Sequence, residues 1–237
     1  MKYLFLNHKM NLTKEEFLNY QEELSKIDTN DTEVVIFPSS TYLSLINGEN
    51  FKVGAQDVCE YEDGSYTGEI SANQLTSLNC SYCLVGHSER RNIYNESSEL
   101  LSLKINNLQS VGITPVLCVG EKNRELRYSV LMEQLDILEG CNIDNLIIAY
   151  EPVYSIGTGV VLDNDDIEEA ILWIKEYALS VYDKDIPVLY GGSVNDSNIS
   201  VLNNIPGLDG FLVGKASLSV SSVKTMVEVI SSGKIME

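Results

Sequence analysis

The segment Tyr82-Cys83-Leu84-Val85-Gly86-His87-Ser88-Glu89-Arg90-Arg91 passes abruptly from apolar to polar residues. Its first four residues show no polar alternation, which is typical of a parallel β-strand buried on both faces. Gly86 interrupts the run, and Ser88-Glu89 is a plausible helix start. The segment therefore predicts a buried strand that ends in a polar loop and continues into a helix.

Seven further apolar runs resemble this strand, and amphipathic helical patterns lie between them. The first helical pattern opens with a capping box, Thr13 to Glu16. Eight strand–helix units in 237 residues average about 30 residues each, which is about the minimum for a βαβ repeat. The total length is near that of a compact eight-fold barrel. We therefore expect an α/β fold, a (β/α)8 TIM barrel forming a single domain over residues 1–237, although a doubly wound open sheet would show the same alternation. The predicted strands are 3–6, 33–37, 51–55, 82–85, 114–119, 146–150, 187–190 and 210–213.

Composition excludes several classes of protein. Sixteen Lys and Arg residues against 35 Asp and Glu residues give a net charge of −19, which argues against a nucleic-acid-binding surface. No apolar run approaches the roughly 18 residues of a membrane span, and the N-terminus lacks a signal-peptide pattern, so we expect a cytoplasmic protein without a membrane partner. Five scattered cysteines predict no disulfide framework, and the lone Cys80-Ser-Tyr-Cys83 predicts no metal site.

Polar residues follow five of the predicted strands at the point where each strand ends. In (β/α)8 barrels the loops at these ends converge on one mouth, where chemistry takes place. We therefore expect an amine, an imidazole, a carboxylate and two glycine-rich turns to share one pocket. The segments are Asn7-His8-Lys9, Gly86-His87, Glu151-Pro152, Gly191-Gly192-Ser193 and Gly214-Lys215.

Two of these residues suit acid–base chemistry. His87 precedes a helix start, whose dipole disfavours the imidazolium form and predicts a neutral ring; the alternative is a structural histidine that caps the helix. Glu151 leaves an apolar strand, so desolvation is expected to raise its pKa as a general base requires; the alternative is a salt-bridged strand end. His8 has no such setting and is expected to be structural.

The last two glycine-rich turns suit a phosphate group, because backbone N–H groups without side-chain cover can approach its oxygens. Lys215 is either a phosphate contact or a solvated surface charge. Neither turn matches a dinucleotide or nucleoside triphosphate fingerprint. Residues 152–159 combine apolar residues with glycines, a pattern that suits a closing lid.

In combination these motifs resemble the triosephosphate isomerase family, and the resemblance extends from Asn7 to Leu218. The matching segments occur in the family's order. They are Asn7-His8-Lys9-Met10-Asn11, Gly54-Ala55-Gln56-Asp57, Tyr66-Thr67-Gly68-Glu69-Ile70-Ser71, Gly86 to Arg91, Ala149-Tyr150-Glu151-Pro152-Val153, Ile156-Gly157-Thr158-Gly159, Tyr190-Gly191-Gly192-Ser193-Val194 and Asp209-Gly210-Phe211-Leu212-Val213-Gly214.

The resemblance implies a barrel that interconverts dihydroxyacetone phosphate and D-glyceraldehyde 3-phosphate in glycolysis and gluconeogenesis, without a cofactor or metal. It implies that Glu151 moves a proton between two carbons and that neutral His87 polarises the carbonyl. Lys9 would attract the dianionic substrate, and Asn7 would orient it. Main-chain N–H groups would bind the phosphate at Gly157, Ser193, Gly214 and Lys215.

The resemblance also implies a closing lid over residues 152–162, latched by Tyr190 and Ser193, and a homodimer. Loop 57–72 would dock into the partner, with Thr67 near the partner's active site. The chain departs from the family at several positions, none of which carries a reacting group. His8 stands where the family usually has an aromatic residue or glycine, Tyr154 replaces the lid's tryptophan, Ser155 its alanine, and residues 160–162 its polar hinge.

Three alternative functions remain at this stage. A different phosphosugar barrel would need a metal cluster or a Schiff-base lysine, for which Lys9 is the obvious candidate. A catalytically impaired scaffold that binds phosphate esters could share the fold, because fold does not fix function. An open-sheet nucleotide binder would show a glycine-rich fingerprint after its first strand, and Asn7-His8-Lys9 is not one.

Overall fold

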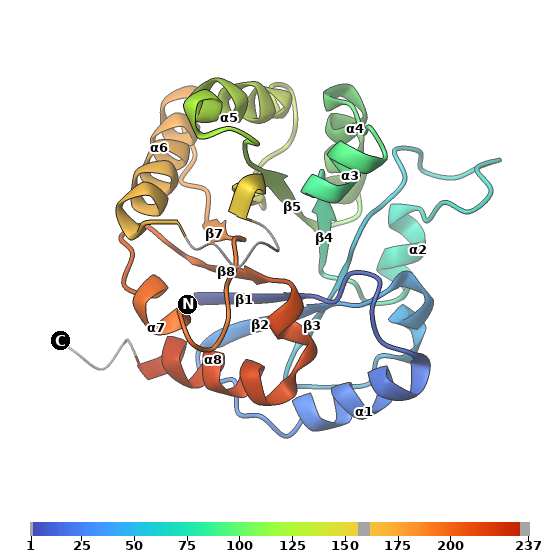
Figure 1. Ribbon diagram of the computed structural model, residues 1–237. Coiled ribbons are helices and arrows are strands. Elements are labelled where there is room, and N and C mark those ends of the chain that lie inside the picture. The colour runs from blue at the N-terminus through green and yellow to red at the C-terminus, as the bar shows by residue number, and fades with distance from the viewer. Residues whose placement is uncertain (1, 156–161, 233–237) are drawn as a thin grey trace.

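Eight parallel strands close into a barrel in the computed structural model, which describes residues 2–155 and 162–232 (Figure 1). The strands follow one another around the barrel in chain order, and β8 pairs with β1 through Tyr3 and Gly210. This last pairing excludes the open-sheet alternative. The strands are β1 Lys2–Asn7, β2 Thr32–Phe37, β3 Lys52–Ala55, β4 Tyr82–Val85, β5 Thr114–Val119, β6 Ile147–Tyr150, β7 Val188–Tyr190 and β8 Gly210–Val213.

Every apolar run that was predicted as a strand is a strand, and the predicted bounds of β4, β5 and β8 are those observed. The helices lie outside the barrel (Figure 1). The capping box at Thr13 and Glu16 starts α1, as predicted. The sequence patterns did not identify α2, α5 or α7, because helices this short contain too few turns for a clear periodicity. The helices are α1 Lys14–Leu24, α2 Ala72–Ser77, α3 Ser88–Ile93, α4 Ser98–Ser110, α5 Arg127–Leu135, α6 Asn164–Tyr182, α7 Ile199–Leu202 and α8 Val220–Ser232.

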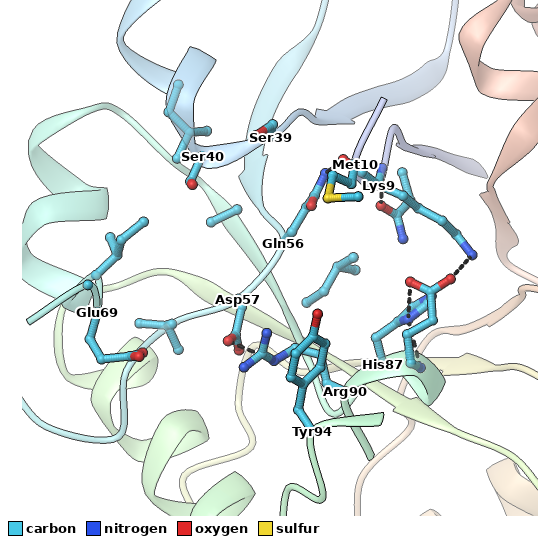
Figure 2. A pocket seen from close by; sticks show the side chains of 18 residues that line it. Lys9, Met10, Ser39, Ser40, Gln56, Asp57, Glu69, His87, Arg90 and Tyr94 are labelled. Carbon is cyan, nitrogen blue, oxygen red and sulfur yellow. Dashed lines mark hydrogen bonds and ion pairs between the residues drawn. The ribbon is translucent and has the colours of Figure 1, made fainter. Parts of the chain in front are cut away.

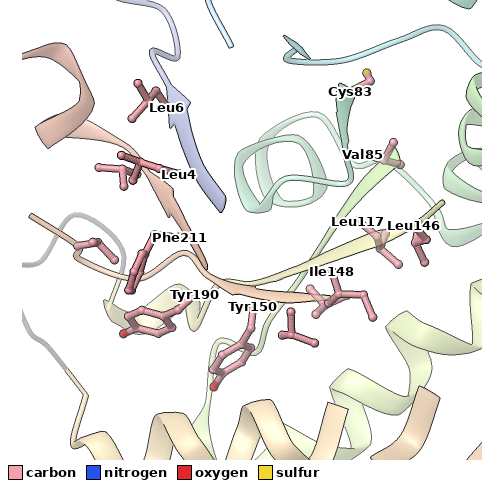
Figure 3. Packing of buried hydrophobic residues seen from close by; sticks show 14 of the residues in the cluster. Leu4, Leu6, Cys83, Val85, Leu117, Leu146, Ile148, Tyr150, Tyr190 and Phe211 are labelled. Carbon is pink, nitrogen blue, oxygen red and sulfur yellow. The ribbon is translucent and has the colours of Figure 1, made fainter. Parts of the chain in front are cut away.

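The strands bury both of their faces, in two separate apolar clusters. Phe5 and Phe37 belong to the cluster inside the barrel. Leu4 and Leu6 belong to the larger cluster between the barrel and its helices, part of which Figure 3 shows. Because side chains alternate along a strand, continuous apolar runs are what this double burial requires.

No described helix is long and apolar enough to cross a membrane.

His8 lies beside the barrel in an apolar pocket, 1% exposed, and neither of its ring nitrogens has a hydrogen-bond partner among the described residues. Its ring meets Tyr20 edge to face, with the ring centroids 4.6 Å apart. Burial lowers the pKa of His8 from 6.5 to about 4. These contacts agree with a structural role for this histidine.

The shifted pKa of His8 predicts acid-sensitive stability. Between pH 6.5 and pH 4 the unfolded chain binds a proton at His8 that the folded protein excludes, so stability falls as the pH falls through this window. The expected loss from this residue is about 3 kcal/mol in the free energy of unfolding. Urea unfolding at pH 7 and pH 4 measures it. His8→Phe, which keeps an aromatic ring but cannot titrate, should lose less stability than wild type between the two pH values. Equal losses in the two proteins would contradict the prediction.

Candidate active site

The carboxyl ends of β4 and β6 bring His87 and Glu151 into direct contact inside the barrel mouth. Both side chains are buried, and His87 Nε2 lies 3.1 Å from Glu151 Oε1. Asn7, the last residue of β1, is also buried. The structure thus assembles residues that are far apart in the sequence, because parallel strands of a closed barrel all end at the same rim.

The ring of His87 is oriented by the start of α3. His87 is the N-cap residue of this helix, and its Nδ1 accepts a hydrogen bond from the backbone N–H of Glu89 at 3.3 Å. This bond requires an unprotonated Nδ1, which leaves the ring hydrogen on Nε2, facing Glu151. The helix therefore selects the tautomer that can donate a hydrogen bond into the site.

The pKa of His87 differs from the sequence expectation of a ring held neutral. Burial lowers the pKa of His87, but the adjacent Glu151 carboxylate raises it, and the net shift is upward. The helix start by itself favours the neutral ring. Burial is the largest single influence on the pKa of His87, but the charge and the hydrogen bond of the carboxylate 3.1 Å away, with a smaller contribution from Glu89, together outweigh it.

The pKa of Glu151 also shifts against expectation. Burial raises the pKa of Glu151, as the sequence suggested, but His87 and Lys9 lower it and the net shift is downward. The backbone N–H of Ser88, 3.5 Å from Oε2, acts in the same direction. The prediction of a raised pKa is therefore wrong, because desolvation is outweighed by nearby donors and positive charge.

Glycines make room for Glu151. A Cβ atom on Gly191 would lie 2.7 Å from Glu151 Cγ, and one on Gly120 would lie 1.8 Å from the Glu151 carbonyl oxygen. A larger residue at position 191 would displace the Glu151 side chain, and one at position 120 would displace its backbone. Gly191 was predicted to bind phosphate, and this contact is a second reason for a glycine there.

Lys9 occupies a strained backbone conformation that several contacts hold in place. Its φ of 53° lies in the left-handed region, which is unfavourable for a residue with a Cβ. Asn7 Oδ1 accepts a hydrogen bond from the Lys9 N–H at 3.0 Å, and Gln56 Nε2 donates one to the Lys9 carbonyl at 2.8 Å. Lys9 Nζ pairs with Glu89 Oε1 at 2.7 Å.

Two of these contact residues, Gln56 and Glu89, were missed as site residues by the sequence reasoning. Both stand inside motifs that carried the family resemblance, which was the available signal. Their partners are not readable from the sequence, because the side chains reach across strands to Lys9.

Of the predicted phosphate residues, Gly214 lies beside Lys9. Gly214 follows β8, and a Cβ built on it would lie 3.5 Å from Lys9 Cε. Ser193 Oγ donates a hydrogen bond to the carbonyl of Ser155 at 2.7 Å, so Ser193 contacts the start of the predicted lid. The Lys215 side chain is exposed. Gly157 and residues 156–161 of the predicted lid lie outside the described residues.

Two cavities flank the contact between His87 and Glu151. The first, about 360 Å³, is lined by Asn7, Lys9 and His87 on one side and by residues of loop 57–72 on the other (Figure 2). The second, about 350 Å³, is lined by Glu151 and Gly120. His87 and Lys9 thus border the first cavity, and Glu151 borders the second.

This arrangement suits proton abstraction beside a carbonyl group. Glu151 is a buried carboxylate that can accept the proton, and His87 Nε2–H and the Lys9 ammonium can stabilise negative charge on the carbonyl oxygen. Within residues 2–155 and 162–232, no three His, Cys, Asp or Glu side chains are grouped as metal ligands.

Comparison with known proteins gives a consistent result. The family model described as triosephosphate isomerase matches residues 2–230. A triosephosphate isomerase from Francisella tularensis subsp. holarctica is 37% identical over 95% of this chain and 96% of its own length. One from Dictyoglomus thermophilum is 37% identical over 96% of this chain and 98% of its own length, and one from Shewanella denitrificans is 36% identical over 95% and 96%.

Proposed function

The chain belongs to the triosephosphate isomerase family, and we propose that it interconverts dihydroxyacetone phosphate and D-glyceraldehyde 3-phosphate with Glu151 as the base. The observation that carries this function is the buried contact of Glu151 with His87, beside Lys9. An aldose–ketose isomerisation needs a base beside the carbon, a hydrogen-bond donor beside the oxygen and a binding site for the phosphate group. These groups meet each need without a cofactor or metal.

In the proposed mechanism the substrate lies between Glu151 and His87. Glu151 removes a proton from the carbon next to the carbonyl, and an enediolate forms. His87 Nε2–H donates to the developing oxygen anion and moves protons between the two oxygens, while the Lys9 ammonium stabilises the charge. Glu151 then returns its proton to the neighbouring carbon, which completes the isomerisation with no net change in the enzyme.

Substrate binding also changes the protonation balance of His87. The carboxylate that raises the pKa of His87 lies 3.1 Å from its Nε2 atom. A substrate between the two groups lengthens this contact and weakens its effect, whereas burial and the helix start continue to favour the neutral ring. Neutral His87 is then the hydrogen-bond donor in the complex.

The phosphate group binds backbone N–H groups of Gly157, Ser193, Gly214 and Lys215 in this proposal, and Asn7 and Lys9 hold the other end of the substrate. Gly214 and Lys9 are neighbours in the structure, which supports one continuous binding site. Backbone donors suit a protein of net charge −19, because they attract an anion without additional basic side chains.

A coupled assay with purified protein, D-glyceraldehyde 3-phosphate and a metal chelator tests this function. We expect rapid isomerisation that the chelator does not affect. A folded protein that binds glycerol 3-phosphate but shows no turnover would instead favour the catalytically impaired scaffold, and loss of activity with chelator would favour a metal-dependent phosphosugar enzyme.

We propose further that the protein is a homodimer in which loop 57–72 docks into the partner's active-site mouth. This loop projects from the barrel between β3 and α2 (Figure 1). Tyr61 and Tyr66 stack at the loop with centroids 4.0 Å apart and are both exposed. Met10 is 95% exposed at the cavity of Figure 2. Dimerisation would cover this apolar surface.

A substitution at the loop tip tests the dimer. Thr67→Arg is expected to weaken dimerisation about 30-fold, as the loss of a central interface contact does, and to lower activity. Sedimentation over a concentration series measures the effect. Thr225→Arg, the same change at an exposed position on α8, should leave the dimer intact. A wild-type monomer, or a Thr67→Arg dimer as tight as wild type, would contradict the proposal.

In this proposal residues 1–237 form a single catalytic domain. The enzyme acts in glycolysis and gluconeogenesis, and it is located in the cytoplasm. The family match across residues 2–230 supports the single domain. Five free cysteines are typical of a reducing compartment.

A further inference from the structure

Arg127, the first residue of α5, is a charged side chain that the proposed mechanism does not use. It is 3% exposed, although a guanidinium remains charged in proteins and its burial is costly unless the charge is paired. Its hydrogen-bond partners must therefore compensate for the burial.

The guanidinium joins three segments of the chain. Nε donates to Glu121 Oε1 at 3.1 Å, in the loop after β5. One terminal nitrogen donates to the Tyr154 hydroxyl at 3.2 Å, after β6, and the other donates to the carbonyl of Asp166 at 3.3 Å, in the first turn of α6. Tyr154 and Asp166 stand on opposite sides of residues 156–161, so one side chain holds both flanks of this segment.

The same network reaches the residues on both sides of Glu151. Glu121 is fully buried, and its Oε1 also accepts a hydrogen bond from the Tyr150 hydroxyl at 3.0 Å. Its backbone carbonyl accepts one from the Val153 N–H at 2.9 Å. Glu121 therefore holds the chain just before and just after the base, and Arg127 neutralises and orients Glu121.

The identity of residue 154 fits this arrangement. A guanidinium has donors only, so each partner must offer an acceptor. The tyrosine hydroxyl accepts the bond from Arg127, whereas the indole of a tryptophan, the usual family residue at this position, can only donate. The departure at Tyr154 and the buried Arg127 thus form a matched pair in this chain.

We propose that Arg127 is a positioning residue for the isomerisation, fixing the chain around Glu151 and both flanks of residues 156–161 in one geometry. The inference rests on the proposed function. A displacement of about 1 Å in a catalytic group can lower the rate about 100-fold. Loss of the Arg127 hydrogen bonds is therefore expected to lower kcat.

Displaced catalytic groups are also expected to change the products of the reaction. If the enediolate is not reprotonated promptly, its C–O bond to phosphate breaks and the bonding electron pair leaves with inorganic phosphate. The remaining enol takes up a proton on carbon and gives up its hydroxyl proton, and so becomes methylglyoxal. The fraction of turnovers that end in methylglyoxal therefore reports how well the site is held, independently of how much enzyme is folded.

Arg127→Lys tests the proposal, because it keeps the charge beside Glu121 but has a single nitrogen in place of the three that reach the separate partners. We expect kcat to fall at least about tenfold with a smaller change in KM, and the methylglyoxal fraction to rise severalfold. Tyr154→Phe, which removes a single contact, should lower kcat roughly threefold and raise the same fraction. Arg124→Lys is the matched control, since the Arg124 side chain is exposed, bonds neither Glu121 nor Tyr154, and can keep its ion pair with the Asp166 carboxylate as a lysine.

The outcomes separate the alternatives. A wild-type protein without isomerase activity would refute the proposed function itself. If wild type is active, unchanged kcat and methylglyoxal fraction in folded Arg127→Lys would overturn the positioning role, as would a loss of activity that merely follows the folded fraction. Should Arg127→Lys not fold, Tyr154→Phe decides: wild-type values for both quantities would overturn the proposal. An equal effect of Arg124→Lys would overturn it as well.

Discussion

Replacing Glu151 by glutamine is expected to lower kcat by about 10³-fold or more, within the range that a general base contributes to proton transfer. The amide has nearly the same shape as the carboxylate but cannot accept a proton from carbon at neutral pH. Gly191 lies against the Glu151 side chain, so a residue of equal size is required for a clean comparison.

Folding and ground-state binding should survive this change. The amide oxygen can still accept a hydrogen bond from His87 Nε2 or from the Ser88 N–H, although not from both, and we expect a loss of about 1 kcal/mol in stability. Affinity for glycerol 3-phosphate, which lacks the carbonyl and cannot react, should change only severalfold. Steady-state kinetics and isothermal titration measure the two effects. Turnover close to that of wild type would refute the assignment of Glu151 as the base.

Replacing Lys9 by alanine is expected to weaken the binding of glycerol 3-phosphate about 100-fold. Lys9 places a positive charge in the mouth of a protein whose net charge is −19. Its removal also leaves Glu89 without its partner at 2.7 Å, so an unpaired carboxylate faces the incoming dianion. Lost attraction and added repulsion act in the same direction, and kcat/KM should fall by a larger factor than affinity because Lys9 also stabilises the enediolate.

Lys215→Ala is the matched control for this prediction. Lys215 is an exposed lysine at the proposed phosphate loop, and its contact is assigned to the backbone N–H, which alanine retains. Direct titration should therefore show nearly wild-type affinity in Lys215→Ala and strongly reduced affinity in Lys9→Ala. Equal losses in the two variants would mean that general surface charge attracts the substrate, and retained affinity in Lys9→Ala would remove Lys9 from the binding site.

The sequence alone determined the positions of the eight strands and which reacting groups follow them. A strand buried on both faces must be a continuous apolar run, so the strands could be located without tertiary information. The reacting residues stand immediately after such runs, and the family motifs at Gly86 and Ala149 surround them. The short helices escaped prediction because they repeat the helical period too few times.

Only the tertiary structure decided whether the sheet closes, how the buried groups titrate and what holds them. Closure depends on the pairing of β8 with β1, the two ends of the chain. The pKa shifts of His87 and Glu151 are the reverse of what each local environment suggests, because each group is the other's nearest charged neighbour. Some partners of Lys9 and Arg127, such as Gln56 and Tyr154, likewise come from distant segments. Local patterns record burial and turns, whereas electrostatic shifts and positioning depend on distances between residues that only the closed barrel brings together.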